Sequence, residues 1–269
     1  MNIAFIGGGN MATALIAGLA KQPENRFHVV DPNPEALARL AADYGAGTAT
    51  AIDAELASAD VIVLAVKPQQ MREVAAALAP HVGPQLVLSI AAGIRGADLS
   101  RWLGGHGAIV RAMPNTPALI RQGITGMVAL PGVSEGQRAA ADAVLRAVGQ
   151  TVWLEDEALI DPVTAVSGSG PAYVFYFLEA MQAAASEMGL DAEQGKQLAL
   201  ATFAGATELA AQSGEPLELL RQRVTSKGGT THAAISSMEA AGVKAAIVEA
   251  MKAAAARGRE LGDELGRDE

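Results

Sequence analysis

The sequence contains no cysteine, few aromatic residues and only four histidines among its 269 residues. Without cysteine, the chain has no disulfide framework, no thiolate nucleophile and no cysteine-ligated zinc. The histidines, at positions 28, 81, 106 and 232, are scattered, and no two of them have the spacing of a helical zinc motif. We therefore expect no metal site.

The sequence also lacks clusters of Lys and Arg and lacks long apolar runs. The net charge is −9 and the pI is near 5.0, which argues against a nucleic-acid or anionic-membrane partner. The longest strongly apolar segment, 172–181, is interrupted by Glu179 and is too short to span a bilayer. The chain starts without a basic segment or a cleavage signal. These absences favour a soluble, cytoplasmic protein with a small-molecule partner, with no nucleic acid and no membrane.

The clearest positive signal is a glycine-rich turn close to the N-terminus. An apolar run at 2–6 leads into Gly7-Gly8-Gly9-Asn10-Met11-Ala12, which fits G-x-G-x-x-A, and residues 11–19 have helical periodicity. A second strand at 27–30 ends at Asp31, about 20 residues beyond the last glycine, where such a unit places an acid for a ribose 2′-hydroxyl. The pattern predicts a dinucleotide site, although a tight turn that merely starts a helix explains the glycines alone.

Strand and helix patterns alternate over residues 1–158. Further strands are predicted at 61–66, 85–90, 108–111, 127–130 and 151–154, with helices at 34–44, 53–58, 71–78 and 135–148 between strands. The alternation predicts an α/β fold with a doubly wound, Rossmann-like parallel sheet. Ligands of such sheets lie beyond the carboxyl ends of the strands, near 7–12, 66–69, 91–93 and 113–117.

Residues 159–269 carry only helical patterns. Helices are predicted from Asp161 through the small residues 167–171, then at 191–212, 231–241 and 243–258, and the charged segment 259–269 is expected to fray. The faces of these helices are rich in Ala and Gly and too apolar for the surface of a monomer. We expect this second, all-α domain to form a homo-oligomer.

The segment 224–231 carries a second candidate anion site. Gly228 and Gly229 precede hydroxyl residues at a helix start, so that several N–H groups could converge on one carboxylate. The alternative is that Thr230 or Thr231 simply caps the helix. The neighbouring His232 is a candidate acid or base, but its helical position could equally turn it away from the site.

Six motifs together resemble pyrroline-5-carboxylate reductase, and they occur in that family's order and spacing. They are FIGGGNM at 5–11, AVKPQ at 65–69, SIAAG at 89–93, RAMPNTPA at 111–118, VSGSGPAY at 166–173 and VTSKGGTT at 224–231. The resemblance implies reduction of L-1-pyrroline-5-carboxylate to L-proline with NADPH or NADH. It also implies a homodimer through the helical domain, often assembled into a decamer.

The resemblance assigns residues to two sites. The cofactor residues it implies, with Asp31 added from the fingerprint, are Ile6, Gly7, Gly8, Gly9, Asn10, Met11, Ala65, Val66, Lys67, Pro68, Ala91, Ala92, Gly93 and Asn115. The substrate residues it implies are Glu157, Thr164, Ser226, Gly228, Gly229, Thr230 and Thr231, with Thr231 as the catalytic hydrogen-bond donor to the imine nitrogen. A lysine such as Lys67, before a proline on a loop, is commonly just solvated.

Two departures from the family pattern and one open choice remain. Lys227 stands where the family more often has Pro, and the spacing between Pro216 and Val224 is one residue longer than usual. Asp31 favours NADH because it repels a 2′-phosphate, while Asn33 or Arg39 could accommodate one. The alternatives are a reductase of another imine, a β-hydroxyacid dehydrogenase, which would need a lysine in a matching motif of the helical domain, and a dinucleotide-sensing module without turnover.

Overall fold

The computed structural model describes residues 1–267, which form two compact units. Residues 1–169 and the end of the chain from Lys252 form the first, here called the sheet unit, and Gly170–Met251 form the second, the helical unit. The sheet unit is therefore discontinuous in sequence. The domain boundary predicted after residue 158 stays a prediction.

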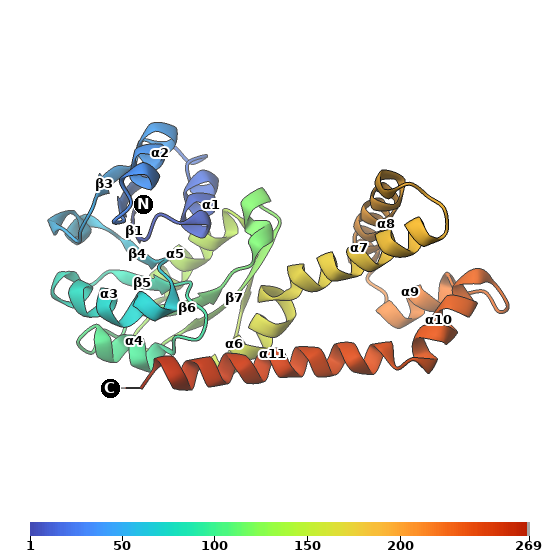
Figure 1. The fold of residues 1–269 in the computed structure, drawn as a ribbon. Coiled ribbons are helices and arrows are strands. Elements are labelled where there is room, and N and C mark those ends of the chain that lie inside the picture. The colour runs from blue at the N-terminus through green and yellow to red at the C-terminus, as the bar shows by residue number, and fades with distance from the viewer. Residues whose placement is uncertain (268–269) are drawn as a thin grey trace. The chain divides into compact units, whose positions relative to one another are not determined.

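The sheet unit is built on an eight-stranded sheet in the order β3-β2-β1-β4-β5-β6-β7-β8 (Figure 1). The strands are β1 (Asn2–Ile6), β2 (Arg26–Val30), β3 (Gly47–Ala49), β4 (Val61–Leu64), β5 (Leu86–Ser89), β6 (Ile109–Met113), β7 (Gly123–Ala129) and β8 (Gly149–Trp153). This order, with β1 between β2 and β4, confirms the Rossmann-like prediction.

One strand pair differs from the predicted parallel sheet, because β6 and β7 are antiparallel. Their connection holds only a short turn of 3₁₀ helix, Thr116–Ile120, which follows Pro114 and contains Pro117. A parallel pair needs a crossover of a dozen or more residues, usually a helix, and this connection is too short for one.

Helices cover both faces of the sheet because successive strand residues point to opposite sides. Ile3 and Phe5 pack on one face with α1 (Asn10–Leu19), α2 (Pro34–Tyr44) and α5 (Glu135–Arg146). Ala4 and Ile6 pack on the other face with α3 (Met71–Leu78) and α4 (Gly96–Trp102). Strands buried on both faces explain the continuous apolar runs in the sequence.

Local signals placed several helix ends correctly. Asn33 caps α2 by accepting hydrogen bonds from the N–H groups of Glu35 and Ala36, and Gly45 ends the helix with φ +65°. Ser134 forms the predicted capping box at the start of α5. The short elements β3 and α4 were not predicted.

The segment after β8 is less regular than predicted. Instead of one long helix from Asp161, the chain forms α6 (Ile160–Val163), a π-helical turn (Thr164–Gly168) and, after Ser169, α7 (Gly170–Glu187). Small residues at 167–170 permit this change of helical pitch, and π-turns are frequent at functional sites.

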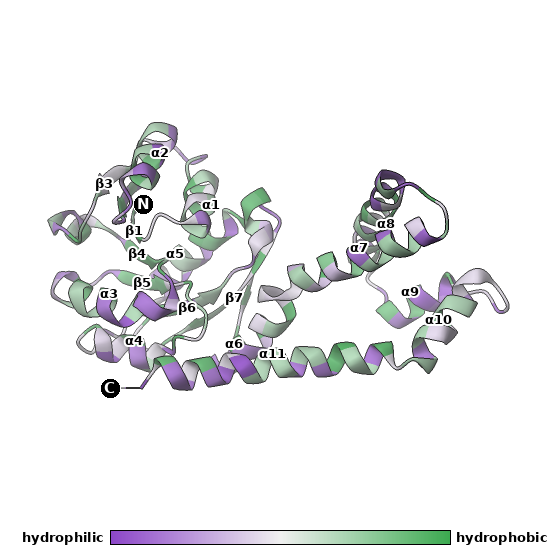
Figure 2. Ribbon diagram, in the orientation of Figure 1, coloured by the Kyte–Doolittle hydropathy of each residue, from purple (hydrophilic) through white to green (hydrophobic). Residues whose placement is uncertain are grey.

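The helical unit contains α7, α8 (Ala192–Ser213), α9 (Leu217–Arg223), α10 (Thr230–Ala240) and the first part of α11 (Val243–Leu265). The predicted cap at Asp191 and stop at Gly214 bound α8, whereas α9 was not predicted. Hydrophobic and hydrophilic residues alternate along α11 (Figure 2). Within residues 1–267, no helix combines the length and the hydrophobicity needed to cross a membrane.

The prediction that residues 259–269 fray is wrong for the part that the structure describes. Helix α11 continues to Leu265, and its last turns pack on the sheet unit, to which they belong. Residues 268 and 269, which that prediction also covered, lie outside the described residues.

Candidate active site

The glycine turn after β1 has a backbone that only glycine tolerates at its first position. Gly7 has φ +104°, and a Cβ atom there would lie 2.7 Å from the carbonyl oxygen of Ala65. Gly9 is the N-cap of α1 and makes no side-chain cap, and a Cβ at this position would meet nothing within 4 Å. The first N–H groups of α1 are therefore not used by a side-chain cap, as an anion site at a helix N-terminus requires.

Asp31 lies beside this turn, as predicted. Its Oδ2 atom accepts a hydrogen bond from the Gly8 N–H at 2.6 Å, and its Oδ1 atom accepts one from the Asn33 N–H at 2.8 Å. Gly8, Gly9, Asn10, Asp31, Asn33 and Arg39 are among the residues that line one cavity of about 270 Å³. The carboxylate thus orders the turn and also lines this cavity.

The other predicted cofactor residues follow neighbouring strands at the same edge of the sheet. Ile6 ends β1, and its carbonyl oxygen accepts a hydrogen bond from the Ala65 N–H at 2.8 Å, which places the segment 65–68 after β4 next to the glycine turn. The segment 91–93 follows β5, and Asn115 follows β6. Met11 is half-buried on the first turn of α1. The structure brings these residues together along the carboxyl ends of β1, β4, β5 and β6.

The Asn115 side chain is buried, and both the nitrogen and the oxygen of its amide make hydrogen bonds within the protein. Its Nδ2 atom donates to the carbonyl oxygen of Ser167 at 3.1 Å, and its Oδ1 atom accepts from the Ile124 N–H at 3.0 Å. Asn115 therefore ties β7 to the π-helical turn that carries Thr164. Any contribution of its amide to cofactor binding comes in addition to this structural role.

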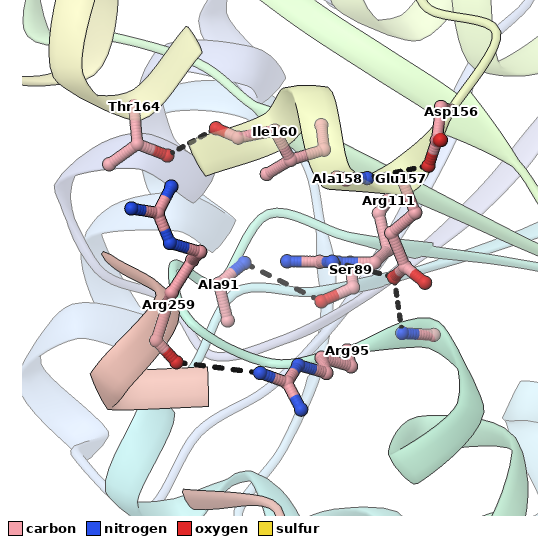
Figure 3. A network of polar contacts seen from close by, with 11 residues as sticks. Ser89, Ala91, Arg95, Arg111, Asp156, Glu157, Ala158, Ile160, Thr164 and Arg259 are labelled. Carbon is pink, nitrogen blue, oxygen red and sulfur yellow. Dashed lines mark hydrogen bonds and ion pairs between the residues drawn. The ribbon is translucent and has the colours of Figure 1, made fainter. Parts of the chain in front are cut away.

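A polar network connects Glu157 to two other elements of the sheet unit (Figure 3). One Glu157 carboxylate oxygen, Oε1, accepts from the Arg111 guanidinium on β6 and from the Gly96 N–H at the start of α4, both at 2.6 Å. Arg111 is buried, and Glu157 supplies its opposite charge. Both residues line a cavity of about 340 Å³ together with Gly93, Arg95 and Arg259.

Arg111 belongs to one of the six motifs but was not predicted as a site residue. The available signal was a charge inside an otherwise apolar strand, Ile109–Met113. A charged residue in such a position is rarely buried unless it is paired. Thr164, also a predicted substrate residue, donates its hydroxyl hydrogen to the Ile160 carbonyl oxygen at 2.8 Å, which leaves the hydroxyl oxygen able to accept.

The second candidate anion site lies in the helical unit. Gly229 is the N-cap of α10, no side-chain hydrogen bond caps this helix, and Thr230 and Thr231 are its first two residues. The capping alternative for these threonines is therefore wrong in this structure. Gly228 has φ +78°, and the Gly229 N–H donates to the Ser226 carbonyl oxygen at 3.0 Å, which forms a tight turn before exposed N–H groups.

Lys227 and His232 flank this turn and are exposed. Glu157 and Thr164, by contrast, belong to the sheet unit. The assignment of both sets of residues to the substrate stays a prediction. Among residues 1–267, no group of three or more His, Cys, Asp or Glu side chains is arranged to hold a metal ion.

Two family models match this chain. The model for pyrroline-5-carboxylate reductase dimerisation matches residues 157–261, and the model for NADP oxidoreductase, coenzyme F420-dependent, matches residues 2–93. The two models together cover the glycine turn, Asp31 and the loop 224–231.

Individual relatives match over nearly the whole chain. The pyrroline-5-carboxylate reductase of Pseudomonas aeruginosa is 49% identical over 269 residues, with 98% of both chains covered. The solved structure of a pyrroline-5-carboxylate reductase from Coxiella burnetii has a TM-score of 0.89 and 39% identity, covering 97% of this chain and 98% of that chain. The Plasmodium falciparum pyrroline carboxylate reductase, solved with NADP bound, has a TM-score of 0.86 and 28% identity, covering 97% and 98%.

These matches agree with the arrangement of the glycine turn, the strand-end loops and the glycine-threonine helix start, and the chain belongs to the pyrroline-5-carboxylate reductase family.

Proposed function

We propose that this chain binds NAD(P)H along the carboxyl edge of its sheet and holds pyrroline-5-carboxylate with the loop at the start of α10. As a member of its family it is an NAD(P)-dependent oxidoreductase that acts on a CH–NH group, and the reaction is the reduction of 1-pyrroline-5-carboxylate to proline. The observation that carries the residue assignments is that a glycine turn leads into a helix without a side-chain cap at two places, the starts of α1 and of α10.

The residues present fit a dinucleotide. The turn at 7–9 leaves the N–H groups at the start of α1 for a pyrophosphate, and the open space at Gly9 allows close approach. The loops 65–68 and 91–93 extend along the same edge, where the rest of the cofactor would lie. The bound nicotinamide supplies the hydride, and the protein supplies binding, orientation and exclusion of water.

The loop 226–231 fits a small carboxylate. The N–H groups at the start of α10 are not used by a side-chain cap, and the helix dipole favours an anion there. Thr231, on the first turn, offers a hydroxyl that would donate to the imine nitrogen. This hydrogen bond makes the C=N carbon a better hydride acceptor, so no cysteine, metal or histidine–carboxylate pair is required. That Glu157 and Thr164 also bind the substrate stays a prediction.

The first experiment measures the loss of nicotinamide absorbance on addition of pyrroline-5-carboxylate to the wild type, Thr231→Ala and Thr207→Ala. Thr207 is a matched control because its hydroxyl donates only within α8, to the carbonyl oxygens of Phe203 and Ala204. Loss of one transition-state hydrogen-bond donor is expected to lower kcat by about 100-fold. Because the cofactor residues belong to the sheet unit, NAD(P)H affinity should change little in Thr231→Ala. An equal loss of cofactor binding would refute this division of roles.

We further propose that NADH is the better cofactor. The Asp31 carboxylate faces the ribose position with both oxygens fixed by backbone N–H groups, so that it cannot easily turn away from a 2′-phosphate. Arg39 lines the same cavity and would act in the opposite direction. We expect a higher kcat/KM with NADH than with NADPH, and Asp31→Ser should reduce the ratio. A clear NADPH preference in the wild type, unchanged by Asp31→Ser, would contradict this.

Homo-oligomerisation follows from the dimerisation family model over residues 157–261. We propose that the dimer forms through the helical unit. The support is an apolar cavity of about 480 Å³ on that unit, lined by residues that include Tyr173, Tyr176, Phe177, Ile247 and Met251. Tyr176 is 73% exposed in the single chain, which is unusual for so large an apolar ring. Light scattering of the purified protein would distinguish a dimer from a decamer. A cytoplasmic location stays a prediction.

A further inference from the structure

The last turns of α11 cover one side of a candidate cofactor loop. We call residues 259–267 the C-terminal clasp. At Gly93, which has φ +71°, a Cβ atom would lie 3.2 Å from the Leu261 Cβ and 3.5 Å from the Leu265 Cδ1. The loop 91–93 therefore has the clasp against one side. Ala91 and Ile94, which flank Gly93, are buried.

A charged pair fixes the clasp to the residue that follows this loop. Arg95 donates to the Asp263 Oδ1 atom at 2.5 Å and to the Arg259 carbonyl oxygen at 3.4 Å (Figure 3 shows the second contact). Gly262 leaves room for this guanidinium, because a Cβ there would lie 3.1 Å from the Arg95 Nε. These partners are separated by more than 160 positions in the sequence, so the contact is entirely tertiary.

The end of the clasp is held by two further arginines. Arg101 of α4 donates to the Gly266 carbonyl oxygen at 2.9 Å, and Arg72 of α3 donates to the Arg267 carbonyl oxygen at 3.4 Å. Carbonyl groups at a helix C-terminus lack partners within the helix, and cations interact favourably with the negative end of its dipole. The clasp is thus anchored independently of the Arg95–Asp263 pair, so removing that pair should leave the helix in place.

We propose that the C-terminal clasp sets the position of the loop 91–93 for the cofactor, and that Arg95 and Asp263 are positioning residues for NAD(P)H binding. The inference rests on the proposed placement of the cofactor at this loop. Leu261 and Leu265 lie against one side of Gly93. The loop 91–93 therefore cannot move toward α11, and its position depends on where the clasp is held. The side chains of Arg95 and Asp263 are 44% and 58% exposed, so the pair contributes little to the stability of the fold.

The test compares Asp263→Asn with Glu260→Gln in the full-length protein. Glu260 is the matched control because it lies one turn away on the same helix and pairs with Arg257, also on α11, at 3.0 Å. The dissociation constants of NADH and NADPH are measured by fluorescence titration, without substrate. The KM for pyrroline-5-carboxylate and the thermal midpoint are measured beside them.

We expect Asp263→Asn to raise the cofactor dissociation constant about threefold to tenfold. The KM for pyrroline-5-carboxylate and the thermal midpoint should stay at the wild-type values, as should every parameter of Glu260→Gln. Asp263→Glu should restore part of the affinity. Arg95→Gln should weaken cofactor binding similarly, and the double variant Arg95→Gln/Asp263→Asn should be no weaker than the worse single variant.

The proposal is overturned if Asp263→Asn binds both cofactors as tightly as Glu260→Gln does. It is also overturned if the weaker binding is accompanied by a lower thermal midpoint and a raised substrate KM, since the pair would then support the fold in general. A failure of the proposed function would be seen in a different measurement. The wild type would then not oxidise NAD(P)H with pyrroline-5-carboxylate, and the substrate-free titration would still decide on the clasp.

Discussion

Replacement of Gly7 by alanine should damage the fold and the nucleotide site together. The backbone at this position has φ +104°, and the new Cβ would lie 2.7 Å from the Ala65 carbonyl oxygen. A strained backbone conformation costs a residue other than glycine about 1–3 kcal/mol. Forcing an atom into a packed position costs about another 1–3 kcal/mol. The carbonyl cannot retreat freely, because the Ala65 N–H is bonded to the Ile6 carbonyl oxygen.

The free energy of unfolding should therefore fall by about 2–6 kcal/mol, a large part of the total stability of most domains. For a unit of this size the thermal midpoint should fall by roughly 5–20 °C. The assay is thermal unfolding followed by circular dichroism, without ligand and at one protein concentration, because both cofactor and assembly shift the apparent midpoint. NAD(P)H titration at low temperature then measures binding by the folded fraction.

Two other glycines provide matched controls. Gly136 lies in the first turn of α5, and a Cβ atom there would meet nothing within 4 Å, so Gly136→Ala should be neutral or stabilise the fold by up to about 1 kcal/mol. Gly9 has φ −72°, so Gly9→Ala should fold normally and lose affinity only for the cofactor. If Gly7→Ala unfolds at the same temperature as Gly136→Ala, the steric argument for the turn is wrong.

Two further predictions concern residues outside the turn. Asn115→Ala should lower the free energy of unfolding by about 1–3 kcal/mol, because it leaves the Ile124 N–H and the Ser167 carbonyl without their partner in a buried position; an unchanged urea midpoint would contradict this. Asp142 is desolvated, which raises its pKa, but hydrogen bonds from Thr151 and Arg146 outweigh this and hold the pKa below its ordinary value of 3.8. A lowered native pKa stabilises the fold above the ordinary value, so the stability difference between the wild type and Asp142→Asn should be constant above about pH 5 and shrink as the pH falls from there through the native pKa. Urea unfolding at several pH values measures this difference in the free energy of unfolding. A difference that grows at low pH would contradict a lowered pKa for Asp142.

Signals within a few residues of each other allowed prediction of much of this fold. Asn33 and Gly45 delimit α2, and Asp191 and Gly214 delimit α8, because caps and stops act locally on the helix that they bound. The glycine turn and Asp31 were predicted for the same reason. A tight turn requires glycines, and a polar residue after an apolar run indicates the end of a strand.

Features that depend on distant partners were not predicted. Helix α4 has no local side-chain cap. Its first N–H, on Gly96, donates instead to the carboxylate of Glu157, which lies 61 positions later in the chain. The extension of α11 through its charged end likewise depends on residues distant in the sequence, since Arg101 and Arg72 donate to carbonyl oxygens at that end. A charged segment without these partners carries the composition of a frayed end, and the sequence alone does not show that they meet.

The discontinuity of the sheet unit has a consequence for synthesis of the chain. All eight strands are complete once residue 153 has been made, but Gly93 acquires its contacts with Leu261 and Leu265 only after more than a hundred further residues have been added. Segments emerge from the ribosome in order, and domains generally fold as units while the chain grows. One side of the loop 91–93 therefore stays uncovered by these residues until Leu261 and Leu265 have been synthesised. A chain interrupted shortly before its last turns would contain the whole nucleotide-binding sheet and still lack the surface against which this loop is packed.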